Sequence, residues 1–483
     1  MQGQGIRKIL GIMTSYFSVT MLPPIVVSLI YGDNTHNVFL VSMVIIIICG
    51  LICWLPVRNV NKELRFRDGF LVVVLIWAVL SLLAAIPLFL VDNPSIRIID
   101  AIFESTSGLT TTGATILAGL DEMPRSILYY RQQLQWLGGM GIIVLAVAVM
   151  PALGVGGMQL YRAETPGPVK DNKLTPRITE TAKAIWFIYL GLTTSCGVFY
   201  YMAGMNPFDA LCHAFSTVAI GGFSTHDASL GYFQSNGIYL IACLFMILAG
   251  LNFALHFSAV RFRKVRVYIN DPEARVYFSL LAGSAAITVF MLLRHGIFDN
   301  PQDNIVQGIV QAVSIITTTG FSTTDFSLWP TFVPVFLILL STAGGCAGST
   351  AGGMKIIRMM LLFRQGVREI SQLVHPNALI PIKLGGKPVP DNVINAVWGF
   401  LSLYIFSFTV LLVLMLATGI DMVTAFSAVT ASLNNLGPGL GDVAKNYAGI
   451  TDFGKVVLTF AMVLGRLELF TLLVLFTPVF WKG

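Results

Sequence analysis

The feature that most constrains this chain is a short segment that recurs four times. Each copy is a run of apolar and small residues, about three helical turns long, and each ends in a glycine. The copies end at Gly113, Gly222, Gly320 and Gly437, which are 109, 98 and 117 residues apart. Repetition at matching offsets indicates one structural unit used four times. We therefore expect four equivalent units that converge on one axis.

The composition places these units in a membrane. Of the 483 residues, 55% are hydrophobic and 11% are charged, and the mean hydropathy is +0.78. A soluble domain is roughly 25% charged. Several apolar stretches reach the roughly 20 residues that a helix needs to cross a bilayer, and we find no alternating strands of the outer-membrane barrel type. The chain is predicted to be an all-α polytopic membrane protein.

Each repeat is predicted to contain a long helix, a short pore helix that ends in the glycine, and a second long helix. Two initial transmembrane helices, 9–31 and 38–57, precede them, and the absence of a cleavage site argues against a removed signal. The predicted helices of the repeats are 69–91, 100–112 and 127–150; 181–204, 209–221 and 237–260; 275–293, 304–319 and 331–363; and 392–418, 421–436 and 453–480. The corresponding divisions are 1–67, 68–178, 179–270, 271–390 and 391–483. This arrangement amounts to ten spans and four re-entrant half-spans around a central pore.

The basic residues predict an orientation. With a cytoplasmic N-terminus, most of the 30 lysines and arginines fall in cytoplasmic loops, in agreement with the positive-inside rule. The pore helices then enter from the outer face. A basic inner face explains the net charge of +6 without nucleic acid. A second interpretation is that the basic loops bind a cytoplasmic partner, and charge alone does not decide between the two. Those loops are 58–67, 162–177, 261–275 and 355–387.

The four re-entrant segments point to ion chemistry. Non-helical backbone at membrane depth is tolerated where it is buried or lines a water-filled cavity. Carbonyls of converging segments can replace the hydration shell of an ion, and the C-terminal ends of helix dipoles favour a cation. Four glycine-rich turns are the plainer alternative, but they do not explain the matching offsets. The predicted filter residues are Thr110, Thr111, Thr112, Gly113, Ala219, Ile220, Gly221, Gly222, Thr317, Thr318, Thr319, Gly320, Asn434, Asn435, Leu436 and Gly437.

Seven motifs are spread along the chain: ESTSGLTTTGAT (104–115), QWLGGMGIIVLAVAVMP (135–151), AIGGFSTHDAS (219–229), GGCAGSTAGG (344–353), VHPNA (374–378), LNNLGPGL (433–440) and GRLELFT (465–471). Together they resemble the Trk/Ktr/HKT superfamily of potassium transporters, most closely its bacterial TrkH/TrkG-type subunit. The resemblance implies four helix–pore–helix units around one pore and potassium uptake across the bacterial inner membrane. It also implies a homodimer and a cytoplasmic nucleotide-binding regulatory subunit of the TrkA type.

In that family a glycine in each filter marks potassium preference, and a serine in the first filter goes with sodium. This chain has glycine at all four places. The resemblance thus implies potassium as the transported ion and no cofactor bound by this chain. Asn434 and Asn435 stand where the first and third filters have threonines, so we expect weaker selectivity than in a fourfold-symmetric channel.

The second helix of the third repeat is predicted to be interrupted. Residues 341–353 contain five glycines in thirteen residues, and each glycine costs about 1 kcal/mol in a helix interior. Close packing against a neighbouring helix is one explanation. A loop across the pore below the filter is the other, and the resemblance favours this loop as a gate. Its glycines are Gly344, Gly345, Gly348, Gly352 and Gly353.

Arg466 lies in the last predicted span, where an unpaired arginine costs several kcal/mol. A structural salt bridge is one interpretation. The resemblance favours the other, in which its charge lies below the filter, repels cations and closes the path. Glu468 is two residues away and does not share a helix face with Arg466, so we expect Glu468 to pair with another helix.

Other polar residues receive lesser predictions. Glu104, on the first pore helix, is expected to hold the filter by hydrogen bonds. Asp100, Asp209 and Asp421 are expected to cap their helices. His213 and His256 are expected to be packed polar groups. Acidic residues on the outer side either concentrate cations or belong to ordinary loops; they are Asp92, Asp121, Glu122 and Asp227.

Other functional classes fit less well. An intramembrane enzyme would need a nucleophile–base pair or a metal motif such as HExxH, and none of the six histidines falls in such a spacing. The chain is therefore predicted not to be an enzyme. It lacks a Walker A motif, so control by a nucleotide would come through a partner. A proton- or sodium-coupled potassium carrier remains open, because a pore and a symporter can share these motifs.

Overall fold

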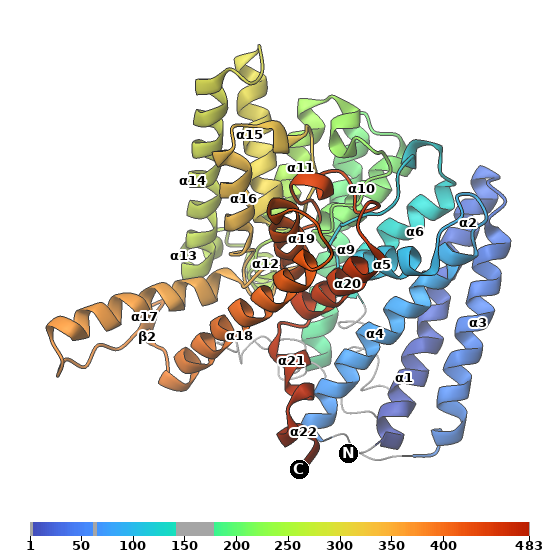
Figure 1. Cartoon of the computed structure of the whole chain (residues 1–483), viewed down its shortest axis with the longest axis horizontal. Helices are drawn as coiled ribbons and strands as arrows, with labels where there is room; N and C mark the ends of the chain where they lie inside the picture. The colour runs from blue at the N-terminus through green and yellow to red at the C-terminus, as the bar shows by residue number, and fades with distance from the viewer. Residues whose placement is uncertain (1–2, 61–64, 142–177, 483) are drawn as a thin grey trace.

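The computed structural model describes residues 3–60, 65–141 and 178–482. Within them the chain is mostly helical, and the one sheet is a hairpin of β1 (Lys383–Leu384) and β2 (Lys387–Pro388). Both chain ends lie at the lower side of the molecule in Figure 1. The predicted all-α class is confirmed.

The two initial helices pack closely through glycine. α1 (Gly3–Ser18) runs beside α3 (His36–Trp54), and α2 (Leu22–Tyr31) extends the first span (Figure 1). A Cβ on Gly11 would lie 2.6 Å from the backbone nitrogen of Trp54, and one on Gly50 would lie 2.3 Å from the Ser15 hydroxyl. Small residues allow this approach, which strengthens helix pairing in membranes.

Each repeat has a first helix, a pore helix and a second helix. In order, they are α4 (Phe66–Leu90), α5 (Ile98–Leu109) and α6 (Arg125–Trp136); α9 (Ile178–Met202), α10 (Pro207–Ala219) and α11 (Asn236–Ala249); α14 (Pro272–His295), α15 (Pro301–Ile316) and α16 (Phe332–Ser341); and α18 (Asp391–Leu416), α19 (Met422–Asn434) and α20 (Asp452–Arg466). Further helices follow the second, third and fourth repeats. They are α12 (Phe253–Phe262) and α13 (Arg266–Asn270), α17 (Ile356–Val374), and α21 (Phe470–Leu473) and α22 (Pro478–Lys482).

Packing joins the four repeats into a closed ring. The first helix of each repeat packs on its own pore helix: α4 on α5, α9 on α10, α14 on α15 and α18 on α19. The second helix packs on the pore helix of the next repeat: α6 on α10, α11 on α15, α16 on α19, and α20 back on α5. Because the last repeat returns to the first, the four pore helices surround a common centre.

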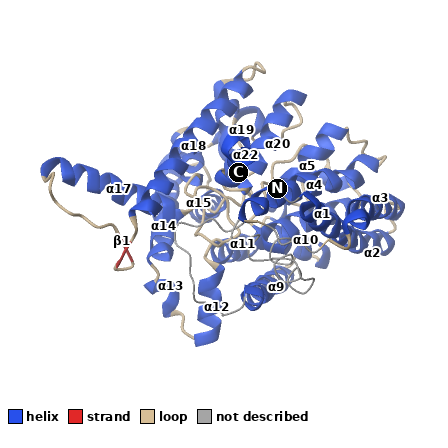
Figure 2. Cartoon of the chain, turned by 90° about the horizontal axis from the view of Figure 1, so that it is seen from below, coloured by secondary structure: helices blue, strands red, loops and turns tan. Residues whose placement is uncertain are grey.

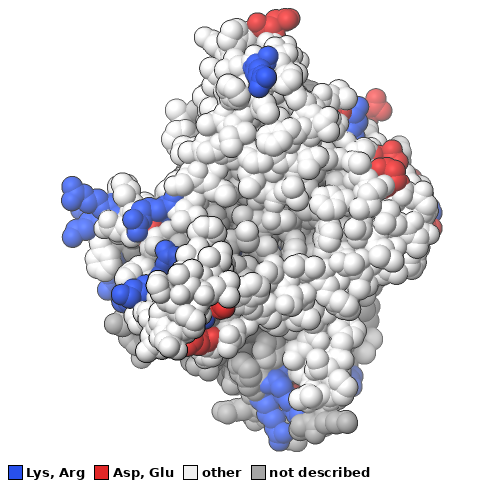
Figure 3. Space-filling model, turned by 60° about the vertical axis from the view of Figure 1, so that its left-hand side comes forward, with Lys and Arg blue, Asp and Glu red and all other residues white. Residues whose placement is uncertain are grey.

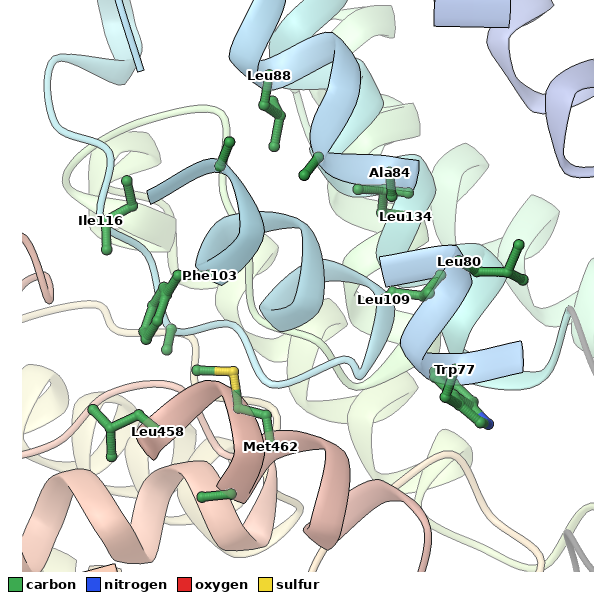
Figure 4. Close-up of a cluster of buried hydrophobic side chains, with 14 of the residues drawn as sticks. Trp77, Leu80, Ala84, Leu88, Phe103, Leu109, Ile116, Leu134, Leu458 and Met462 are labelled. Atoms are coloured by element: carbon green, nitrogen blue, oxygen red, sulfur yellow. The ribbon is translucent and has the colours of Figure 1, made fainter. Parts of the chain in front are cut away.

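The first pore helix illustrates this wrapping. Figure 4 shows Phe103 of α5 facing the α20 side chains Leu458 and Met462, while Leu80 and Ala84 of α4 lie on the other side of the helix. Since lipid tails are as apolar as these side chains, close van der Waals packing holds the helices together here. The pore helix is fixed by its own repeat and by the last one.

Two second helices predicted as continuous are broken. The prediction for 237–260 is wrong because α11 ends at Ala249 and α12 leaves it at 94°. A Cβ on Gly250 would lie 2.2 Å from the Tyr277 hydroxyl, and Asn252 caps α12 by accepting from the Ala254 amide. The prediction for 453–480 is also wrong, since α20 and the segment Phe470–Phe476 meet at 108°.

Among the described residues, six helical segments are long and apolar enough to cross a membrane, or eight if each bent pair is one span. Ten spans were expected. Of the other two, predicted helix 127–150 extends past residue 141 into residues outside the described part, and 331–363 is split between α16 and α17. Figure 3 shows a broad middle region with few charged side chains, while most of the lysines and arginines in this view lie along the left edge and at the bottom.

The segment between repeats three and four projects from the body. α17 lies at the far left in Figures 1 and 2, and the β1–β2 hairpin follows it. The predicted interruption is present, since α16 ends at Ser341 and α17 begins only at Ile356. The residues between them form the loop described below.

Candidate ion-conducting site

The four predicted filters (residues 110–113, 219–222, 317–320 and 434–437) adopt the same backbone form. The glycine of each has positive φ, and so does the residue two places before it: Thr111 (56°), Gly113 (82°), Ile220 (55°), Gly222 (77°), Thr318 (65°), Gly320 (85°), Asn435 (53°) and Gly437 (92°). The residue before each glycine donates a 2.8 Å amide hydrogen bond back to a pore-helix carbonyl; the acceptors are those of Ser107, Ser216, Ser314 and Ala431. The repeated sequence thus gives four equivalent backbone turns.

These turns contact one another in cyclic order. A Cβ on Gly113 would lie 2.1 Å from the Gly221 carbonyl oxygen, and one on Gly222 would lie 2.0 Å from that of Thr319. One on Gly320 would lie 2.1 Å from the Leu436 oxygen, and one on Gly437 would lie 2.8 Å from the Thr112 oxygen. Each filter glycine therefore lies against the carbonyl that precedes the glycine of the next filter. The fourth filter closes the ring on the first.

Side chains of the filters are buried and turn back into the protein. The hydroxyls of Thr110 and Thr112 are 2.8 Å apart, and so are those of Thr317 and Thr319. In the fourth filter, Asn435 donates to the Thr112 hydroxyl at 2.9 Å. The asparagines thus change the side chains but preserve the backbone turn.

Three further side chains hydrogen-bond the filters, and none of them was among the predicted site residues. Gln135 donates to the Gly221 carbonyl at 2.6 Å and accepts from the Phe223 amide at 3.1 Å. Tyr404 donates to the Asn434 side chain at 2.7 Å, and Tyr447 donates to the Gly437 carbonyl at 2.7 Å. Gln135 opens the QWLGG motif, which is the one signal that would have drawn attention to it.

Glu104 bonds the chain just after the first filter rather than residues 110–113 themselves. Its carboxylate accepts from the Thr115 hydroxyl at 2.9 Å and from the Ile116 amide at 2.9 Å, and it pairs with Arg131 at 2.8 Å. Both charged side chains are at most 1% exposed. At the same offset in repeat two, His213 contacts the Ser224 hydroxyl at 2.9 Å. These polar groups fix the chain that leaves the first and second filters.

The capping predictions are only partly correct. Asp421 caps α19 by accepting from the Val423 and Thr424 amides. Asp100 and Asp209 do not cap. Asp100 lies inside the first turn and pairs with Lys455 at 2.6 Å, and Asn206 takes the cap position of α10 before Asp209.

Remaining polar predictions concern histidines and the outer side. His256 is a packed polar group as expected, since it contacts the Tyr268 hydroxyl at 2.8 Å and the Leu248 carbonyl at 2.9 Å. Asp227 accepts from the amides of Gly119 and Leu120. These contacts account for both residues as structural groups.

His226 joins the turns after the first two filters. It pairs with Asp121 and, at 3.2 Å, with Asp209, and it stacks on Tyr232. Burial disfavours the charged form, but hydrogen bonds to these carboxylates and their negative charges outweigh it and raise the pKa of His226 above its ordinary 6.5. The imidazolium therefore links repeats one and two most strongly at low pH.

The predicted intramembrane loop (residues 341–353) lies directly against the filters. The Gly352 amide donates to the Thr318 hydroxyl at 2.7 Å, and the Gly353 amide donates to the Asn434 carbonyl at 3.1 Å. The Thr350 hydroxyl donates to the Val218 carbonyl at 3.0 Å. The loop thus contacts the ends of the second, third and fourth pore helices.

Glycine is required at several places in the loop. Gly344, Gly348 and Gly353 have φ of 63°, 73° and 72°, which other residues adopt only with strain. A Cβ on Gly352 would lie 2.0 Å from the Asn434 carbonyl, and one on Gly345 would lie 2.5 Å from the Ala351 Cβ. The glycines allow the loop to fold tightly against the filter backbone.

Arg466 completes the contact with the first filter. Its guanidinium donates to the Thr111 hydroxyl at 3.1 Å, to the Thr350 carbonyl at 3.4 Å and to the Gly139 carbonyl at 2.8 Å, and it also contacts the Gly138 carbonyl. It thereby joins filter one, the intramembrane loop and the turn after α6. Glu468 pairs with Arg358 of α17, which confirms that it binds another helix.

Comparison with known proteins decides the family. A family model described as TrkH, cation transport protein, matches residues 35–482. The chain belongs to the TrkH cation transport family. Relatives include the Trk system potassium uptake proteins TrkH of Vibrio parahaemolyticus, 53% identical with 100% of both chains covered, and of Escherichia coli K12, 50% identical with 100% of both covered. The crystal structure of the potassium transporter TrkH from Vibrio parahaemolyticus has a TM-score of 0.91, 50% identity and 100% coverage of both chains.

Family membership agrees with the architecture. The TrkH family comprises cation transport proteins and not enzymes, and the structural match extends over the initial helix pair and all four repeats. A multi-pass membrane protein with four helix–pore-helix–helix units is thereby established.

Proposed function

We propose that this chain conducts potassium across the bacterial inner membrane through the ring formed by its four filters. The observation that carries the proposal is the cyclic contact of the filter glycines with the next filter's carbonyl. Four backbone segments in such a ring can present carbonyl oxygens to one ion, replacing its hydration shell. The C-terminal ends of the pore helices add negative potential at the same centre. The names of the TrkH relatives supply potassium as the ion.

The proposed ion-binding residues are the sixteen residues of the four filters. In this proposal the intramembrane loop and Arg466 close the path beyond them. A positive charge bonded to Thr111 next to a cation path opposes the passage of potassium. Opening then requires Arg466 and the loop to leave the filter ends.

The proposed orientation has the N-terminus in the cytoplasm. The lysines and arginines of the loops between repeats support it through the positive-inside rule. With this orientation the filters face the outside and the intramembrane loop lies on the cytoplasmic side of them. The pore helices then meet extracellular potassium first.

Two partners belong to the proposal through the family resemblance. One is a second copy of the chain in a homodimer. The other is a TrkA-type cytoplasmic nucleotide-binding subunit, which would act on the basic loops near α12, α13 and α17. Control by nucleotide would then be indirect, since the chain carries no Walker A motif.

A proton- or sodium-coupled potassium carrier that uses the same filter is the second candidate. Rubidium-86 uptake into proteoliposomes that contain this chain separates the two. A channel takes up rubidium without a proton or sodium gradient, is blocked by potassium and is only weakly blocked by sodium. Uptake that requires either gradient would replace the channel by the carrier. Absence of potassium competition would contradict both.

A further inference from the structure

Glu273 connects the intramembrane loop to a distant helix. It lies in the first turn of α14 and is 6% exposed. Its Oε1 accepts from the backbone amide of Ala347, in the loop, at 2.8 Å, and from that of Ile357, in the first turn of α17, at 3.1 Å. One carboxylate oxygen of α14 therefore joins the loop and the start of α17, which lie 74 and 84 residues further along the chain.

The start of α17 needs such an acceptor. The first amides of a helix have no partner within the helix, and the N-cap residue of α17 is Lys355, whose side chain provides no cap. A lysine side chain has no acceptor atom. Glu273 supplies the missing cap from α14.

The loop has a second attachment, at the break between α11 and α12. The Cys346 amide donates to the Gly250 carbonyl at 2.9 Å, and the Phe253 amide donates to the Gly348 carbonyl at 3.0 Å. Phe253 is the first residue of α12, and Glu273 lies in the first turn of α14, so the α12–α13 segment lies between these two attachments. That segment carries the exposed basic residues Arg261, Arg263, Lys264 and Arg266. Movement of the segment therefore acts on the loop from both ends.

We propose that Glu273 is a positioning residue that holds the intramembrane loop against the filters by bonding the loop and the start of α17 together. The proposal rests on the role of the loop as the gate. Both hydrogen bonds come from backbone amides, so losing them leaves donors without a partner at the loop and at the start of α17. Loss of Glu273 frees both amides and loosens the loop without changing a filter residue.

The test uses the full-length chain in proteoliposomes, with wild type, Glu273→Ala, Glu273→Gln and Asp271→Asn. Asp271→Asn is the matched control, because Asp271 caps α14 through Ala274 and asparagine keeps that cap. Hydrogen–deuterium exchange of the peptide that contains Ala347 reports the attachment directly. Rubidium flux without any partner reports the gate.

Glu273→Ala is expected to speed exchange at this peptide roughly tenfold or more, and to raise partner-free flux by a similar factor, because both hydrogen bonds to Oε1 are lost. Glu273→Gln, which retains one acceptor oxygen, falls between wild type and Glu273→Ala. Asp271→Asn matches wild type in both measurements.

Unchanged exchange at the Ala347 peptide in Glu273→Ala would overturn the proposal. Faster exchange with unchanged flux would support the attachment and count instead against the loop as the gate, so the two failures are distinguishable. If Glu273→Ala does not fold, Glu273→Leu, which is close to glutamate in size but has no acceptor atom, decides the question, and exchange equal to wild type would again overturn the proposal.

Discussion

Alanine substitution at the four filter glycines should have graded effects on ion flux. The grading follows from the distance between each added Cβ and the next filter. Real Cβ contacts stay above about 3.0 Å, so the carbonyls facing Gly113, Gly222 and Gly320, at 2.0–2.1 Å, must move by roughly 1 Å. At Gly437 the nearest distance is 2.8 Å, and a shift of roughly 0.2 Å is enough.

The energetic cost of each substitution sets the expected loss of flux. A left-handed backbone costs an alanine about 1–2 kcal/mol at every one of the four positions. Overpacking adds about 1–3 kcal/mol at the three tight positions. Since about 1.4 kcal/mol corresponds to a factor of ten in rate, we expect these three variants to conduct roughly tenfold to a hundredfold less than Gly437→Ala.

The assay is rubidium-86 uptake into proteoliposomes with matched protein content, competed by potassium and by sodium. Gly283→Ala is the control, because its Cβ would meet no atom within 4 Å in α14; it should conduct like wild type. The three tight variants should also lose discrimination between potassium and sodium. Equal flux in all four variants, or the largest loss at Gly437, would refute the ring geometry.

Three further predictions concern single contacts around the filters. Arg466→Ala removes the contacts to Thr111 and the loop and should raise partner-free rubidium leak, by roughly tenfold if one charged hydrogen bond is lost on closing. Glu104→Gln leaves buried Arg131 without its charge partner and should lower the free energy of unfolding by about 3–5 kcal/mol, measured by denaturation in detergent. His226→Gln should lower the melting temperature most below pH 6.5. Because the pKa of His226 is raised on folding, its stabilisation is complete below the ordinary value and is lost as pH rises through the raised one.

Each of these has an outcome that would contradict it. Unchanged leak with normal expression would remove Arg466 from the closed path. A loss of stability below about 1 kcal/mol for Glu104→Gln would mean that the pair is solvated rather than buried. A melting-temperature difference for His226→Gln that grows with pH would reverse the assigned sign.

The repeat and its glycine-dependent turns can be predicted from the sequence because they depend on local residues. Glycine at a fixed offset predicts a backbone that needs positive φ, and the four glycines have it. The glycine-rich stretch 341–353 predicts a helix interruption, since helix propensity is local. Glu468 was assigned a partner on another helix simply because Arg466 does not share its helix face.

Contacts between distant segments are what the sequence does not reveal. The position of Asp100 at the start of its helix predicts a cap, but Asp100 instead pairs with Lys455, which lies 355 residues away. The break after Ala249 lies in an apolar run, and the Tyr277 hydroxyl and the intramembrane loop occupy the space beside it. Glu273 and Gln135 bond backbone amides and carbonyls, which carry no sequence signature. Tertiary packing, rather than propensity, determines each of these.

The ring of four filters as one ion site is tested most directly by anomalous diffraction from crystals of this chain grown in rubidium. We predict rubidium density on the axis enclosed by residues 111–113, 220–222, 318–320 and 435–437. Added potassium should displace this rubidium. Rubidium bound elsewhere, or between only two of the filters, would contradict it.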